Sequence, residues 1–197
     1  RVKDAQLTGS TDSITLNLDG AGAIVNLGSE SDVDGDFETI NIVAEGGNSD
    51  LGVGQGFGAD ATTITITGSA DLDLGSGVSF AKVTDFDASA ATGDVDVVIA
   101  NRAAASETAV SIKTGSGADV VDMGALVAAN RGDTTVDLGA GNDSLDIAGI
   151  KDQDTGSSYD GGEGTDTLTI STAILAAADF ARISNFEILL YSKIRGI

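Results

Sequence analysis

Cysteine and histidine are absent from all 197 residues of this sequence. Their absence excludes disulfide bonds, thiolate chemistry, structural zinc and imidazole acid–base catalysis. Proline is also missing, so the backbone N–H groups are all free to join sheet ladders. Aromatic residues make up only 4% of the chain, and the apolar residues are mainly Ala, Val, Ile and Leu. Small aliphatic side chains of this kind suit thin, regularly stacked sheets.

Basic residues are scarce. Ten lysines and arginines stand against 31 acidic residues, which gives a net charge of −21 and a pI near 4.1. Such a surface repels nucleic acids and anionic lipids, and no segment approaches the roughly 20 apolar residues of a membrane span. We therefore expect neither nucleic-acid binding nor membrane insertion. Most of the acids are aspartates, which are natural ligands of hard cations, and cations are expected to offset the charge.

The strand signal is an alternation of apolar and polar residues that recurs along the chain. Thr, Asp, Asn or Ser stands between the apolar positions, and Gly/Asp/Asn/Ser turns separate the segments. This pattern predicts an all-β chain of short strands, each with one buried and one solvated wall. The predicted inward residues are Ile14, Leu16 and Leu18; Ile40 and Ile42; Ile64 and Ile66; Leu72 and Leu74; Val95, Val97 and Ile99; Val110 and Ile112; Val136 and Leu138; Leu145 and Ile147; Leu168 and Ile170; Ile188 and Leu190.

Three segments share one glycine–aspartate pattern. They are Gly115-Ser-Gly117-Ala-Asp119-Val-Val121, Gly139-Ala-Gly141-Asn-Asp143-Ser-Leu145 and Gly162-Glu-Gly164-Thr-Asp166-Thr-Leu168. The step from Asp119 to Asp143 is 24 residues, and the step from Asp143 to Asp166 is 23. A nearly fixed period of this size is typical of a solenoid, in which one repeat forms one coil.

The residue types in this pattern point to calcium. Glycines let the backbone turn sharply and aim carbonyl oxygens inward, while the aspartate adds a carboxylate. Oxygen ligands without nitrogen or sulfur fit Ca²⁺. The predicted ligands are Gly115, Gly117, Asp119, Gly139, Gly141, Asn142, Asp143, Gly162, Gly164 and Asp166. Upstream, Gly56-Phe-Gly58-Ala-Asp60 keeps the order without the apolar step, which makes Asp60 either a further ligand or part of a plain turn.

The three turns resemble the glycine- and aspartate-rich repeats of RTX proteins. The resemblance covers residues 115–170, and it implies type I secretion and calcium-driven folding outside the cell. RTX toxin blocks run in uninterrupted nines, whereas an additional strand and loop separate these motifs, which is more similar to bacterial surface-layer proteins. Four further segments resemble parts of surface-layer proteins and large adhesin repeats more loosely. They are Val83-Thr-Asp-Phe-Asp87-Ala-Ser-Ala90, Thr92-Gly-Asp-Val-Asp-Val-Val-Ile99, Phe37-Glu-Thr-Ile-Asn-Ile42 and Asn185-Phe-Glu-Ile-Leu-Leu190.

The predicted fold is a right-handed parallel β-solenoid with calcium in its turns. Residues 101–197 are expected to form the RTX-like part. Residues 1–100 are expected to form a more irregular β-stack on the same axis, with a β-sandwich as the alternative. Because the chain begins at Arg1 with no visible signal peptide, we expect a mature fragment or an excised domain.

Two functions follow from this interpretation. The first is a secreted structural protein that self-assembles on a bacterial cell surface, with itself as main partner and a cell-surface glycan as a further one. The second is a calcium-stiffened spacer, an adhesin module or an export domain. No nucleophile elbow, phosphate loop or metalloprotease motif occurs, and the only candidate catalytic pairs are arbitrary pairs of carboxylates. The chain is therefore not expected to be an enzyme.

Overall fold

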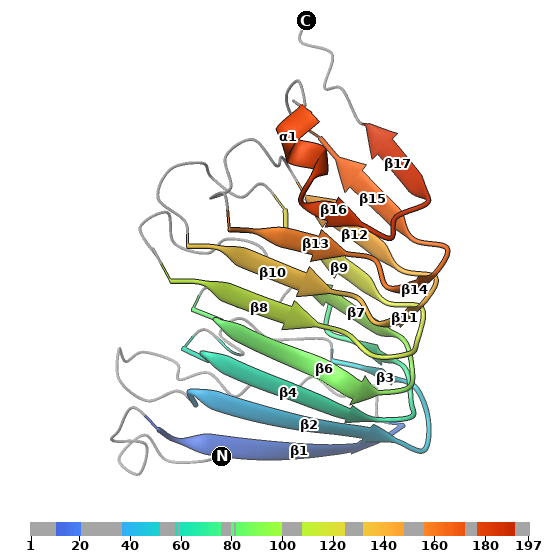
Figure 1. Ribbon diagram of the computed structural model, residues 1–197. Coiled ribbons are helices and arrows are strands. Elements are labelled where there is room, and N and C mark those ends of the chain that lie inside the picture. Colours follow the sequence, from blue (N-terminus) through green and yellow to red (C-terminus); the bar gives the residue numbers. More distant parts are fainter. Residues whose placement is uncertain are drawn as a thin grey trace, which may run out of the picture.

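The chain winds into a right-handed parallel β-solenoid (Figure 1). The computed structural model describes residues 11–20, 37–51, 58, 60–75, 80, 82–99, 108–124, 132–147, 156–171 and 177–191. Each coil places one strand in a front sheet, turns, and returns through a strand of a second sheet. The predicted fold class is confirmed. The sandwich alternative for the first half is wrong, because the paired strands there are parallel and sandwich sheets are antiparallel.

Two sheets run through the described residues from one end to the other. The first sheet has eight strands in the order β1 (Ser13–Asp19), β2 (Thr39–Glu45), β4 (Thr63–Gly68), β6 (Asp85–Ala91), β8 (Val110–Lys113), β10 (Thr134–Asp137), β13 (Ser158–Asp160) and β16 (Ile183–Ser184). The second sheet has seven strands in the order β17 (Ile188–Tyr191), β15 (Thr167–Ile170), β12 (Ser144–Ile147), β9 (Val120–Asp122), β7 (Val95–Val98), β5 (Leu72–Asp73) and β3 (Ser49–Asp50).

Two small elements complete the coils. A short ladder joins β11 (Ala140–Gly141) to β14 (Glu163–Gly164) at the edge where the chain passes from the first sheet to the second. A single helical turn, α1 (Ala177–Phe180), precedes β16. Among the described residues, no helix has the length and the apolar character needed to cross a membrane.

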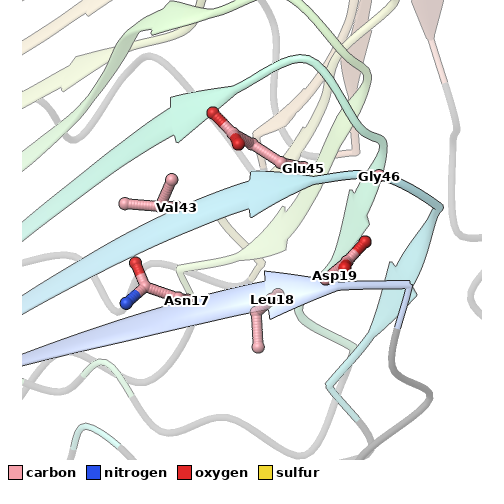
Figure 2. A pocket seen from close by; sticks show the side chains of 6 residues that line it. All are labelled: Asn17, Leu18, Asp19, Val43, Glu45 and Gly46. Carbon is pink, nitrogen blue, oxygen red and sulfur yellow. The ribbon is translucent and has the colours of Figure 1, made fainter.

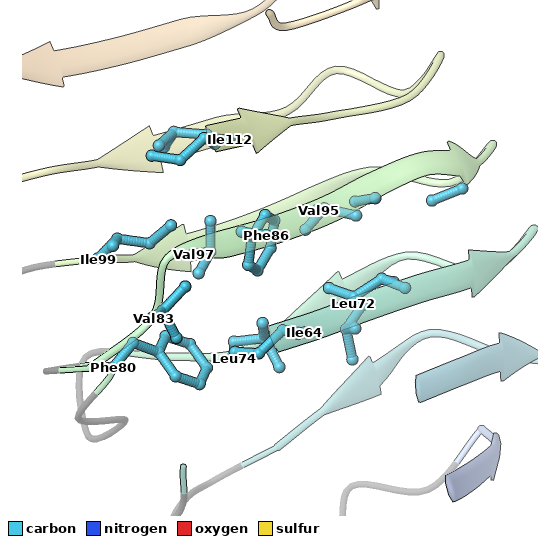
Figure 3. Close-up of a cluster of buried hydrophobic side chains, with 14 of the residues drawn as sticks. Ile64, Leu72, Leu74, Phe80, Val83, Phe86, Val95, Val97, Ile99 and Ile112 are labelled. Carbon is cyan, nitrogen blue, oxygen red and sulfur yellow. The ribbon is translucent and has the colours of Figure 1, made fainter. Parts of the chain in front are cut away.

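The core lies between the two sheets and consists of columns of similar side chains. Parallel pairing in register places Val97, Val121, Leu145 and Leu168 one above another in the second sheet. Figure 3 shows how side chains of both sheets meet in the middle coils, with Phe86 near the centre of the group. All of these side chains are buried, and each contributes about 1.5–3 kcal/mol by leaving water. The coil-by-coil repetition of the sequence is thus the source of the core.

The last strand departs from the predicted pattern. The alternation predicts that Ile188 and Leu190 point inward, but they lie beside Thr167 and Thr169 on the outer face and are 41% and 51% exposed. Leu189 instead continues the core column of Leu168. In an all-apolar run such as Ile188–Tyr191, alternation carries no information about which face is inward. The pairing of β17 with β15 therefore determines which residues of β17 face inward.

Candidate metal centre

The three motif aspartates form one column at the turn into the second sheet. Asp119, Asp143 and Asp166 are the residues directly before β9, β12 and β15, and their exposures are 0%, 2% and 0%. The N–H of Asp119 donates to Oδ1 of Asp143 at 2.8 Å, and the N–H of Asp143 donates to Oδ1 of Asp166 at 2.8 Å. Each carboxylate in this aspartate column thus satisfies the backbone of the preceding coil.

Both ends of the aspartate column continue the same contact. The N–H of Val95 donates to Oδ1 of Asp119 at 2.7 Å, and the N–H of Asp166 donates to Oε2 of Glu187 at 2.8 Å. Glu187 was not among the predicted site residues. Its signal is the Phe–Glu pair before a strand, because Glu38 of the other such pair likewise accepts the N–H of Asp12 at 2.8 Å. The glutamates of both Phe–Glu segments therefore accept a backbone N–H from the preceding coil.

The second oxygens of the three carboxylates differ. Oδ2 of Asp119 accepts the N–H of Gly115 at 3.1 Å. Oδ2 of Asp143 and Oδ2 of Asp166 are buried and have no hydrogen-bond partner. A buried carboxylate oxygen without a partner is costly, and buried polar groups are almost always satisfied. A bound cation or a proton on each of these two oxygens would remove that cost.

The electrostatics of the column agree with that requirement. Burial raises the pKa of Asp143 to about 7, and the neighbouring carboxylates of Asp119 and Asp166 add to the rise. Burial likewise raises the pKa of Asp119 and of Asp166. Asp94, in the coil before the first motif, raises the pKa of both Asp119 and Asp143 through its charge, although it was not a predicted site residue. A bound cation would relieve this repulsion.

Oxygen atoms of the turns converge beside two glycines. A Cβ at Gly141 would overlap the carbonyl oxygen of Gly117 and would lie 2.9 Å from Oδ1 of Asp143. A Cβ at Gly164 would overlap the carbonyl oxygen of Gly141 and would lie 3.4 Å from Oδ1 of Asn142. These spaces are therefore lined by carbonyl, carboxylate and amide oxygens, the donor set that calcium prefers.

Other predicted ligands also stabilise the stack through hydrogen bonds. The carbonyl oxygens of Gly115 and Gly139 each accept an N–H from the next coil at 2.8 Å. Oδ1 of Asn142 accepts the N–H of Thr165 at 2.9 Å. Within the described ranges, no group of three or more acidic side chains is placed to hold one metal ion. A cation here would consequently depend on one buried carboxylate per position together with backbone carbonyls.

Asp60 lies apart from these turns. It precedes β4, at the edge where strands of the first sheet begin, whereas the aspartate column lies at the opposite edge. Its Oδ1 forms an ion pair with Lys82 of the next coil. Lys82 therefore places a positive charge beside the Asp60 carboxylate.

A separate hollow of about 360 Å³ lies at the ends of β1 and β2 (Figure 2). It is lined by Asn17, Leu18, Asp19, Val43, Glu45 and Gly46. Its two ionisable side chains are Asp19 and Glu45, which are exposed partners in the β1–β2 register. The hollow belongs to the first coils and shares no residue with the aspartate column.

The close approach at Gly164 makes a testable prediction. Gly164 has a φ of +146°, and an added Cβ would strike backbone, so Gly164→Ala should destabilise the protein by about 2–3 kcal/mol. Gly47→Ala is the matched control, because its Cβ would meet only the Cα of Gly20 at 3.2 Å and its φ is not positive. Urea unfolding in saturating calcium measures both. Equal losses for the two variants would contradict close packing at Gly164.

Comparison with models of known protein families, with curated proteins and with solved structures gives no match.

Proposed function

We propose that this protein is a calcium-dependent structural protein that is secreted and self-assembles on a bacterial cell surface, as a surface layer or an extracellular filament. The observation that carries the calcium role is the pair of buried, partnerless oxygens of Asp143 and Asp166. Calcium would be held there by these carboxylates with glycine carbonyls of the same turns. When bound, it would supply positive charge to a column in which the carboxylates of Asp119 and Asp166 both raise the pKa of Asp143.

Calcium would act by linkage between binding and folding. An ion that binds only the folded chain stabilises it by RT ln(1 + [L]/Kd) at each site. Where calcium is scarce, as in the cytosol, the acidic chain would stay expanded and exportable. Millimolar calcium outside the cell would then drive the coils together. In this proposal the protein performs no catalysis, and it binds neither nucleic acid nor the membrane interior.

The self-assembly role is supported by β17, the edge strand of the second sheet in the described part of the chain. All four residues of the edge strand β17 are exposed, from Ile188 at 41% to Tyr191 at 52%. Exposed apolar strands at a sheet edge favour association with another chain. The alternative is a calcium-stiffened spacer, adhesin module or export domain, and it is favoured by the continuity of both sheets from the first coils to the last.

A calcium titration separates these proposals. Circular dichroism and sedimentation velocity are measured from excess chelator to several millimolar calcium. Folding together with growth into large particles is the expected result, whereas folding to a compact monomer would favour the spacer. β-Structure that is unchanged by chelator at neutral pH would refute the calcium role. Magnesium at the same concentrations is the control, because its strict octahedral geometry suits carbonyl-rich turns poorly.

A further inference from the structure

We infer that the turns at Asp143 and Asp166 each bind one calcium ion, and that the turn at Asp119 binds none because Lys113 stands where the other two turns have an aspartate. This inference rests on the calcium role proposed above and assigns its ligands. The three motifs share the same Gly-x-Gly-x-Asp sequence. In two of the turns the aspartate keeps one buried oxygen without a hydrogen bond, whereas in the first turn both oxygens accept hydrogen bonds.

The division begins with the N–H of the first motif glycine. In the second turn, the N–H of Gly139 donates to Oδ1 of Asp137 at 3.2 Å. In the third turn, the N–H of Gly162 donates to Oδ1 of Asp160 at 3.1 Å. Each of these aspartates ends its strand in the first sheet, two residues before the glycine. Because it accepts the glycine N–H, that N–H is not available to the motif carboxylate.

The first turn lacks this acceptor. Lys113 pairs in register with Asp137, which pairs with Asp160, so the three residues occupy the same position in successive coils. A lysine ammonium group has no acceptor atom. The N–H of Gly115 therefore donates to Oδ2 of Asp119 instead, at 3.1 Å.

This difference changes which oxygens of the motif carboxylates accept hydrogen bonds. Asp119 uses both oxygens for backbone N–H groups, one from Val95 and one from Gly115. Asp143 and Asp166 use Oδ1 in the same way, but their Oδ2 atoms stay buried without a partner. A carboxylate whose oxygens already accept hydrogen bonds gains less from a cation than one with a buried free oxygen. In this inference Asp119 is thus a structural residue that holds the backbone N–H groups of Val95 and Gly115, and not a calcium ligand.

The backbone of the turns shows the same division. Gly139 and Gly162 have φ of +82° and +89°, and Gly141 and Gly164 have φ of +150° and +146°. Neither Gly115 nor Gly117 has a positive φ. The second and third turns also pair with each other through β11 and β14. Two turns therefore share one conformation, and the turn that follows Lys113 has another.

Calcium stoichiometry tests the inference, by isothermal titration calorimetry and by equilibrium dialysis with the full chain. We expect two ions for the wild type and three for Lys113→Asp, which supplies the missing acceptor and frees Oδ2 of Asp119. Lys113→Met removes the charge without supplying an acceptor, and it should keep two ions. Asp137→Lys should bind one ion, whereas Asp137→Asn, whose amide oxygen still accepts the Gly139 N–H, should keep two. Circular dichroism in saturating calcium confirms that each variant is folded.

The outcomes distinguish this inference from the function on which it rests. Three ions in the wild type, or two in Lys113→Asp, would overturn the inference and leave the calcium role standing. A wild type that binds no calcium would overturn the calcium role and the inference together. Two ions in the wild type, a gain in Lys113→Asp and a loss in Asp137→Lys would support both.

Discussion

Without calcium, the folded protein will lose stability as the pH rises from about 4 to about 7. In the folded state, burial raises the pKa of Asp143 from 3.8 to about 7. Between those values the unfolded chain ionises Asp143 while the folded chain keeps it protonated, so the folded state binds more protons and its stability falls with rising pH. The shift corresponds to a loss on the order of 4 kcal/mol, a large share of the total stability of a typical domain.

The pKa values of Asp119 and Asp166 are raised as well, so their contributions have the same sign. Calcium competes with protons for the ionised carboxylates and therefore binds more tightly as the pH rises. In chelator the melting temperature should fall as the pH rises from 4, until no folded state remains near neutral pH, and the gain in stability on adding calcium should be larger at pH 7.5 than at pH 5. Thermal unfolding followed by circular dichroism across this pH range measures both effects.

Two variants separate the aspartate column from general charge repulsion, which also grows with pH in so acidic a chain. Asp143→Asn removes a buried carboxylate and should flatten the pH dependence in chelator. Asp85→Asn removes an exposed one, at the start of β6, and should leave the slope close to the wild type. A melting temperature that rises with pH in chelator, or equal slopes for the two variants, would contradict this account.

The sequence predicts the fold because its two determinants recur, the alternation along the chain and the glycine–aspartate turn in three successive coils. Alternation selects strands with one buried wall, and the recurring glycine–aspartate turn brings the chain back after one coil. The same repetition hides what differs between the turns. Asp119, Asp143 and Asp166 occupy equivalent positions in the motif, yet their second oxygens differ because Lys113 replaces an aspartate outside that motif.

Two other features also depend on contacts between coils. The role of Glu187 depends on its place one coil after Asp166, 21 residues away, where the spacing of the motif has already shortened. The inward face of β17 depends on pairing, because four successive apolar residues have no alternation to interpret. Contacts between coils, rather than local propensity, therefore decide the details of this solenoid, since strand residues that pair between successive coils lie more than 20 positions apart.

Assembly in calcium will depend on the two outward apolar residues of β17. Ile188 and Leu190 lie beside Thr167 and Thr169 of β15, so the double variant Ile188→Thr, Leu190→Thr extends the polar outer face by one strand. Leu189 and Tyr191, which continue the inner columns, are unchanged. Because strands that are apolar on both faces are typical of sheets covered on both sides, we expect the wild-type outer face of β17 to be buried between copies.

The double variant should fold with the same calcium midpoint as the wild type but sediment as a monomer in millimolar calcium, where the wild type is expected to form large particles. Val120→Thr is the control. Val120 is 40% exposed on the same outer face, three strands further down the sheet, and its replacement should leave assembly intact if the contact is confined to the end of the solenoid. Particles of wild-type size in the double variant would place the contact elsewhere. A monomeric Val120→Thr variant would extend it along the face of the second sheet, so that copies would associate side by side rather than at their ends.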